Sequence, residues 1–214
     1  MTKHYENWLV LGPVRSGTMA VVNSLFYYKP LQLRRSQRPG LEPRRLEPRE
    51  IIHAHNPDWL DHVTKDTGVV ICVRNPLASA LSWSILPKFG LVDQQPIFHF
   101  HRKDAAKVQE ISENIQPFYL PLEQVCRAVE QAENFYARIL QCEHLGQHRI
   151  IIYESWCDDP GRILTQLGIR PYPIPHLLKS PGTPKQWIEN FDEVIAYGKT
   201  LNINNFLQVC QLTQ

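Results

Sequence analysis

Four short apolar runs recur along the chain, at residues 8–12, 50–55, 69–73 and 149–153. The third run is apolar at every position, which is typical of a strand buried on both faces of a parallel sheet. Between these runs, apolar spacing or composition predicts helices at about 18–28, 58–65, 77–83, 104–114 and 122–145, and beyond the last run it predicts helices at about 160–167 and 189–199. Strands that alternate with helices predict an α/β fold with three layers, a central parallel sheet and helices on both faces.

A basic segment at residues 29–49 interrupts this alternation. It contains four prolines and six arginines. Because proline lacks a backbone donor, we expect a long loop here instead of a helix or a central strand. Two interpretations stay open: a solvated excursion, or a lid or recognition surface for an anionic acceptor or cofactor.

Composition narrows the class of protein. The length of 214 residues allows one sizeable core and predicts a single domain over 1–214. The 23 basic and 21 acidic residues nearly balance, which argues against a nucleic-acid-binding protein. The five cysteines form no Cys-x-x-Cys pair and are interpreted as free thiols in a reducing compartment. The polar N-terminus predicts no signal peptide, and no apolar run reaches membrane-spanning length, so we expect a soluble, cytoplasmic protein.

The turn after the first apolar run has the composition of a phosphate-binding loop. Gly12 and Gly17 occupy the first and sixth positions of the Walker A pattern, between a predicted strand and a predicted helix. The amides of such a loop and the positive end of the helix dipole stabilise an anion. Thr18 and Met19 stand where a nucleotide triphosphatase has Lys and the hydroxyl that binds Mg²⁺, and the cation, Arg15, lies inside the loop. The pattern therefore predicts a phosphate site at which no metal is expected.

Chemically useful side chains also follow the other three runs. His55 follows the second run, Arg74 follows the third and Tyr153 ends the fourth. Because the carboxyl ends of parallel strands meet at one edge, these residues should lie near the loop. A second anion site at Arg74 and Ser82 would suit a cofactor with two separate phosphate groups, and a neutral histidine could take a proton from an acceptor. His53 shares a strand face with His55 and is interpreted as a packed neighbour.

Four segments in this order resemble motifs of one enzyme family. Residues 13–18 are similar to its 5′-phosphosulfate loop, in which Lys or Arg precedes Ser-Gly-Thr, and residues 52–57 are similar to its Lys-Thr-His-Leu-Pro segment. Arg74-Asn75-Pro76 with Ser82 resembles its 3′-phosphate motif, and residues 152–160 resemble its Tyr-Glu-Asp and Asp-Pro stretch. The family is that of the sulfotransferases that use 3′-phosphoadenosine 5′-phosphosulfate (PAPS), most closely the cytosolic type, with a P-loop-containing α/β fold.

The resemblance implies an enzyme that transfers a sulfuryl group from PAPS to a hydroxyl or amine and releases adenosine 3′,5′-bisphosphate (PAP). The acceptor would be a small molecule or a glycan, with no metal, membrane or nucleic acid involved. The six arginines of residues 29–49 favour an acidic acceptor, although arginines that bind the cofactor would give the same composition. His55 would be the general base, and Arg15 would stabilise the leaving phosphate. The implied cofactor-binding residues are Arg15, Ser16, Gly17, Thr18, Met19, Arg74, Ser82, Tyr153, Lys179 and Gly182.

The chain also departs from the family in places. Ala20 and Val21 stand where the cytosolic enzymes place a Trp against the adenine, and residues 179–182 keep only part of an Arg-Lys-Gly clamp. The family's Lys-Thr-Val dimer motif is not visible near the C-terminus. Two other functions stay open, a P-loop kinase of small metabolites and a non-catalytic nucleotide-binding protein. Other branches of the family use Glu as the base, so Glu42, Glu47 and Glu50 are alternatives to His55, although they are interpreted as surface acids.

Overall fold

The computed structural model describes residues 5–28, 31–36, 42–89, 91–92, 95–96, 105–143, 145, 148–155, 163, 165, 167–168 and 182–212. Its contacts divide the chain into two compact units. The first comprises Met1–Arg74, Ala132–Ile174 and Asn204–Gln214, and the second comprises Asn75–Gln131 and Pro175–Ile203. The single-domain organisation expected from the length stays a prediction.

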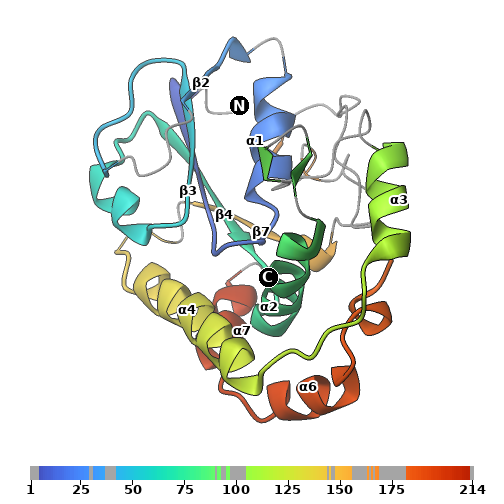
Figure 1. The fold of residues 1–214 in the computed structure, drawn as a ribbon. Coiled ribbons are helices and arrows are strands. Elements are labelled where there is room, and N and C mark those ends of the chain that lie inside the picture. Colours follow the sequence, from blue (N-terminus) through green and yellow to red (C-terminus); the bar gives the residue numbers. More distant parts are fainter. Residues whose placement is uncertain are drawn as a thin grey trace. The chain divides into compact units, whose positions relative to one another are not determined.

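The first unit contains a sheet of five parallel strands (Figure 1). The strands are β1 (Asn7–Leu11), β2 (Arg34–Ser36), β3 (Glu50–Ala54), β4 (Thr67–Val73) and β7 (Arg149–Ile152). Their order in the sheet is β2-β3-β1-β4-β7. Helix α1 (Thr18–Phe26) follows β1 and packs on one face through the cluster that includes Val22 and Leu25. The predicted α/β fold with a central parallel sheet is confirmed.

Side chains of the central strands are buried on both faces of this sheet. Val10 and Val70 pack toward α1, whereas Leu9 and Ile71 point to the opposite face, and each of the four residues is 0% exposed. Burial on both faces removes the need for polar alternation, which explains the unbroken apolar runs. Helix α7 (Asn204–Gln211), which the sequence did not predict, contacts β4.

Strand β2 lies within the basic segment that was predicted to be a loop. The prediction is wrong for Arg34–Ser36, which pair with Glu50–Ile52 of β3. An edge strand needs a hydrogen-bonded partner on one side only, so a few residues between prolines suffice to form one. The helix expected at 58–65 is a 3₁₀ helix, η2 (Pro57–His62).

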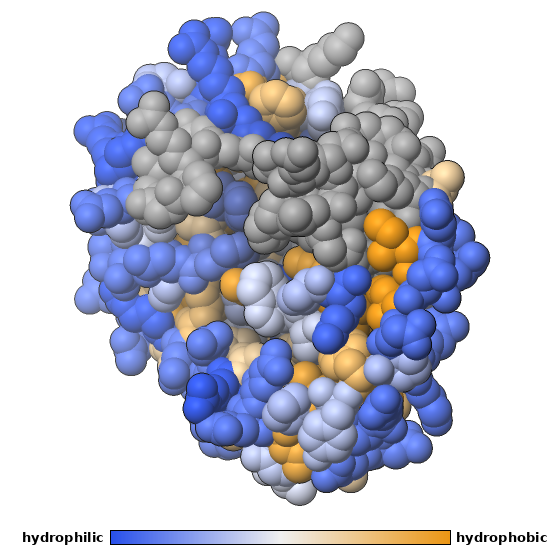
Figure 2. Space-filling view, viewed as in Figure 1, coloured by the Kyte–Doolittle hydropathy of each residue, from blue (hydrophilic) through white to orange (hydrophobic). Residues whose placement is uncertain are grey.

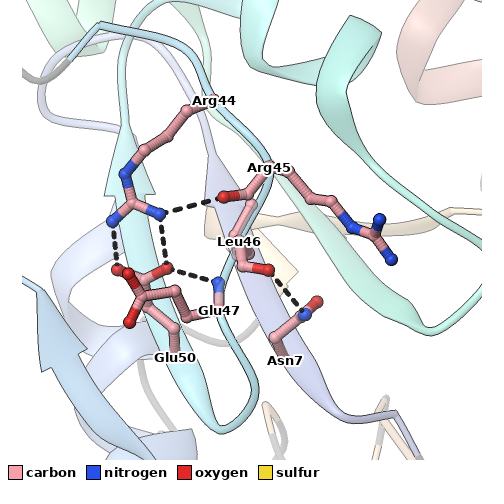
Figure 3. Close-up of polar contacts among 6 residues, drawn as sticks. All are labelled: Asn7, Arg44, Arg45, Leu46, Glu47 and Glu50. Carbon is pink, nitrogen blue, oxygen red and sulfur yellow. Dashed lines mark hydrogen bonds and ion pairs between the residues drawn. The ribbon is translucent and has the colours of Figure 1, made fainter.

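An ion pair fixes the second half of the basic segment against the start of β3 (Figure 3). The Arg44 guanidinium donates to both carboxylate oxygens of Glu50, at 3.0 and 2.6 Å, and to the Arg45 carbonyl at 2.9 Å. The Glu47 amide donates to the same carboxylate at 2.8 Å. Glu50 is 4% exposed, so its interpretation as a surface acid is wrong. It also begins the strand that His55 follows, about 16 Å along the strand, so it is not placed to serve as a base there.

Replacing Arg44 with Ala should destabilise the protein because it leaves a buried carboxylate without its cation. We expect the free energy of unfolding to fall by about 2–4 kcal/mol, measured by urea denaturation. Arg45→Ala is the matched control, because Arg45 contributes its carbonyl and its side chain is exposed. The double variant Arg44→Ala with Glu50→Gln should recover part of this lost stability, because it also removes the buried charge. If the double variant lost as much stability as the two single variants added together, the ion pair between Arg44 and Glu50 would not contribute to folding.

The second unit is mainly helical. Its elements are α2 (Pro76–Ile85), η3 (Leu86–Phe89), β5 (Leu91–Val92), β6 (Gln95–Pro96), α3 (Ala105–Asn114), η7 (Pro184–Gln186), α6 (Phe191–Gly198) and the first part of α4 (Leu122–Leu140). Its core includes Leu81, Val125 and Trp187. The Asn190 side chain accepts from the Leu120 amide at 2.9 Å and donates to the Leu120 carbonyl at 3.0 Å, which ties α6 to the segment before α4.

The surface visible in Figure 2 is mainly polar. In Figure 2, hydrophilic residues cover most of the coloured surface, and hydrophobic residues appear in small groups. Within the part of the chain that the structure describes, no helix combines the length and the apolar character that crossing a membrane requires.

Candidate anion-binding and proton-transfer site

The loop between β1 and α1 has the conformation of a tight anion cradle. The Ser16 amide donates to the Pro13 carbonyl at 3.1 Å, and both Arg15 (φ 67°) and Gly17 (φ 87°) adopt left-handed backbone conformations. Gly17 precedes α1, and no side chain caps that helix. The amides of Thr18 and Met19 in the first turn have no carbonyl four residues earlier within the helix, so they point toward any group held in the loop.

Arg15 is a non-glycine residue in a conformation that usually favours glycine. Such strain of order 1 kcal/mol persists only where the surroundings hold it. Here the Arg15 carbonyl accepts a hydrogen bond from Arg74 Nη1 at 2.7 Å. Partial burial and then the charge of Arg74 lower the pKa of the Arg15 guanidinium. Two guanidinium groups at one partly desolvated position create a site that an anion would stabilise.

His55 is hydrogen-bonded to the first residue of the loop. Its Nδ1 lies 2.6 Å from the Gly12 carbonyl oxygen, which can only accept, so Nδ1 carries the proton in the neutral ring. The lone pair is therefore on Nε2, the nitrogen that can take a proton from another molecule. Loss of hydration beside the loop lowers the pKa of His55, and the bond to Gly12 opposes that shift. The ring is thus neutral at pH 7 and of fixed tautomer.

Three residues hold Arg74 at the carboxyl end of β4. Its guanidinium lies over the Tyr153 ring, 4.1 Å from the centroid, and binds the Arg15 carbonyl. The Tyr136 hydroxyl accepts from the Arg74 amide at 3.0 Å and donates to the Arg74 carbonyl at 2.8 Å. No carboxylate among the described residues pairs with Arg74, so it does not close the sheet edge as an ordinary ion pair. Its charge is held beside the loop instead.

Tyr136 supports Arg74, whereas the sequence assigned it to the apolar stripe of a core helix. It lies in α4 and is fully buried, and burial raises the pKa of its hydroxyl, so the group stays protonated. A buried hydroxyl requires partners, and here both partners belong to the backbone of Arg74. The signal available in the sequence was a tyrosine at a core position of α4, where Phe or Leu would pack without a polar group.

Tyr136→Phe should leave the amide and carbonyl of Arg74 without their partner. Because buried polar groups that lose a partner cost about 1–3 kcal/mol, we expect the free energy of unfolding to fall by that amount in denaturant titrations. Tyr119→Phe is the matched control. It removes the same hydroxyl from a residue that is 57% exposed, so the free energy of unfolding should not change. Equal stability of Tyr136→Phe and the parent protein would show that the bonds to Arg74 contribute nothing.

Two buried polar atoms at the loop indicate that it fits an anion. Within the described part of the chain, Ser16 Oγ and Arg74 Nε have no hydrogen-bond partner, and Ser16 is 0% exposed. Buried donors are normally satisfied, so both atoms are suited to a ligand oxygen. A Cβ on Gly12 would lie 2.2 Å from Ser16 Oγ and 2.8 Å from the Cys72 carbonyl, so only glycine allows this close approach.

A second group of nitrogen-bearing side chains lies on the β3 side of the loop. The His53 and His55 rings are 5.2 Å apart and nearly perpendicular, which confirms that the two residues share a strand face. Burial, then His55 and then Arg35 lower the pKa of His53 to about 4. Arg35 donates to Asn23 Oδ1 at 3.3 Å and contacts Met19 Sδ at 3.1 Å. The sequence did not single out Arg35 from the other arginines of its segment.

The first unit contains most of the predicted site residues. The loop residues 12–19, His55, Arg74 and Tyr153 lie in the first unit, at the carboxyl edge of its sheet. Ser82, on α2, and Gly182 belong to the second unit. Gly182 has φ 80°, and a Cβ there would lie 2.2 Å from Gln186 Oε1, which explains the glycine without a ligand. Lys179 lies outside the described residues.

Metal coordination gains no support from the described side chains. Among them, no three His, Cys, Asp or Glu residues lie close enough to hold a metal ion.

Comparisons with known proteins add little to this geometry. No protein-family model matches the chain. No curated protein matches it either. Among solved structures, it is similar to the crystal structure of a sulfotransferase from Alicyclobacillus acidocaldarius, with 15% identity, a TM-score of 0.45, and coverage of 94% of this chain and 98% of that one. A likeness at this level does not show the family of the chain.

Proposed function

We propose that the chain is a sulfotransferase that moves a sulfuryl group from PAPS to a hydroxyl or amine of a small-molecule or glycan acceptor. The observation that supports this most strongly is the bond between His55 Nδ1 and the Gly12 carbonyl. It fixes a neutral base beside an anion-binding loop, and its Nε2 lone pair is turned to accept a proton. Phosphate binding alone would require the loop but not the base.

The residues of the loop would hold the 5′-phosphate end of the donor. The first-turn amides of α1, Ser16 Oγ and the Arg15 guanidinium would serve as the donors there. Their charge and dipoles would stabilise negative charge on the phosphate oxygen as its bond to sulfur breaks. Arg74, with a buried Nε that has no partner among the described residues, would bind the 3′-phosphate. Tyr153 lies against Arg74 and would contact the adenosine part.

Proton transfer in this proposal runs through His55. The acceptor's oxygen or nitrogen forms a bond to sulfur, the bond from sulfur to the 5′-phosphate oxygen breaks, and the acceptor's proton goes to Nε2. PAP leaves with the electron pair of the broken bond. The lowered pKa keeps Nε2 unprotonated at pH 7, as a general base requires.

The test is transfer from ³⁵S-labelled PAPS to a panel of alcohols, phenols, amines and sugars, with and without EDTA, together with calorimetry of PAP and ATP. We expect transfer that persists in EDTA, and tighter binding of PAP than of ATP. Phosphoryl transfer from ATP that requires Mg²⁺ would select the kinase alternative. Binding of PAP without transfer to any acceptor would select a non-catalytic nucleotide-binding protein.

A further inference from the structure

Helix α7 depends on contacts with α4 for its order. It has 8 residues, and a helix of that length is marginal by itself in water. The Glu133 carboxylate of α4 accepts from the Asn205 amide at 2.9 Å and from the Phe206 amide at 3.0 Å. These amides lie in the first turn, where they have no acceptor within the helix, and a carboxylate there also interacts favourably with the helix dipole. Glu133 therefore holds the first turn of α7 against α4 (Figure 1).

Docking of α7 places Phe206 against Tyr136. The centroids of the two rings are 5.8 Å apart, and Phe206 is 8% exposed while Tyr136 is 0% exposed. The ring of Phe135 also lies beside that of Tyr136, but it belongs to the same helix. Phe206 is thus an aromatic contact that a separate element supplies, and its packing restricts how the Tyr136 ring can turn.

The Tyr136 hydroxyl connects this packing to the donor site. It accepts from the Arg74 amide and donates to the Arg74 carbonyl, so it holds the peptide groups on both sides of that residue. The direction in which the Arg74 side chain leaves the end of β4 depends on those two peptide groups. Because Arg74 is the residue assigned to the 3′-phosphate, a turn of its backbone would move the binding group. Contacts made by α7 therefore reach the donor site through one hydroxyl.

We propose that Glu133 and Phe206 are positioning residues for the donor: by docking α7 on Tyr136, they hold Arg74 where it binds the 3′-phosphate. This inference rests on the proposed function and adds to it a dependence of donor affinity on the C-terminal helix. Both residues act through Tyr136, and neither needs to touch the donor. Coupling of this kind is reciprocal, so binding of the donor should also stabilise α7 against local opening.

The first experiment is Glu133→Gln, which keeps the size of the side chain and removes the charge that accepts from α7. We expect the affinity for PAP, measured by calorimetry, to fall roughly fivefold or more, because fewer molecules hold Arg74 correctly. The affinity for adenosine 5′-phosphate, which lacks the 3′-phosphate, should stay within about twofold of the parent value. Phe206→Leu removes the ring contact and should give the same split between the two nucleotides.

Glu143→Gln is the matched control for Glu133→Gln. Glu143 is exposed and lies shortly after α4, so its replacement changes the net charge equally and should alter neither affinity. The split itself separates positioning from a general loss of structure, because partial unfolding would weaken the binding of both nucleotides by the same factor.

A second experiment tests whether the effect runs through the Tyr136 hydroxyl. In a Tyr136→Phe background, Glu133→Gln should not lower the ratio of PAP affinity to adenosine 5′-phosphate affinity any further. Amide hydrogen exchange gives a direct readout: PAP should slow exchange of the α7 amides in the parent protein. Glu133→Gln should speed exchange of the Arg74 amide, which donates to Tyr136, and this measurement requires no nucleotide.

Three results would overturn the inference. One is an affinity ratio that Glu133→Gln and Phe206→Leu leave unchanged, and another is exchange of the α7 amides that is equal with and without PAP. The third is a full further loss from Glu133→Gln in the Tyr136→Phe background, which would mean that α7 acts by another route. All three leave PAP binding and sulfuryl transfer by the parent protein intact. A parent protein that binds no PAP would instead reject the proposed function, and the role of Glu133 and Phe206 with it.

Discussion

His55→Ala should reduce sulfuryl transfer by roughly 10²- to 10⁴-fold, because a positioned general base contributes about that much. Affinity for PAP should stay within about threefold of the parent value, since the bond to Gly12 involves the carbonyl of the loop and none of its donors. Single-turnover transfer of ³⁵S and calorimetry with PAP measure the two effects separately.

The pH dependence provides an independent check on the same residue. A base acts only when unprotonated, and the pKa of His55 is lowered from its ordinary value of 6.5. Lowering the pKa extends the neutral form to lower pH, so the acidic limb of kcat/KM should lie below pH 6.5. His62→Ala, on the exposed surface of η2, is the control and should change neither rate nor profile. Unchanged transfer in His55→Ala would mean that another group accepts the proton.

Arg74→Ala should weaken PAP binding by roughly 10- to 150-fold, because hydrogen bonds to a charged group contribute about 1.5–3 kcal/mol. The effect should be much smaller for adenosine 5′-phosphate, which lacks the 3′-phosphate. The ratio of the two affinities, measured by calorimetry, therefore isolates the contact from any disturbance of the loop through the Arg15 carbonyl.

Arg149→Ala is the matched control for Arg74. Arg149 is exposed and begins β7, the neighbouring strand, so it lies at the amino edge of the sheet. Its removal changes the net charge equally and should leave the affinity ratio unaltered. If Arg74→Ala weakened both nucleotides by the same factor, the 3′-phosphate would not be bound by Arg74. The PAP affinity of Arg74→Lys should lie between that of the parent protein and that of Arg74→Ala, because an ammonium keeps the charge and loses the paired geometry.

Local patterns predicted the central sheet well and its margins poorly. The runs that became β1, β3 and β4 are almost wholly buried, and burial on both faces requires mainly apolar side chains. The run that became β7 is apolar after Arg149, although this strand lies at an edge of the sheet and is only partly buried. Strand β2 has the sequence Arg-Arg-Ser and forms only because β3 offers it an open edge. Helix α7 was missed because its order depends on distant contacts, such as the Glu133 carboxylate that accepts from the Asn205 and Phe206 amides at 2.9 and 3.0 Å.

The sequence by itself determined which chemical groups stand at the ends of the strands. Glycines set the loop, and strand direction put His55 and Arg74 at the same edge, because parallel strands share their carboxyl ends. The tertiary structure decided how those groups are held. The tautomer of His55 depends on a contact across 43 positions of sequence, and the support of Arg74 by Tyr136 depends on one across 62. The direction of Arg35 depends on a contact across 12 positions. No periodicity encodes such pairs, because they form only when packing brings separate elements together.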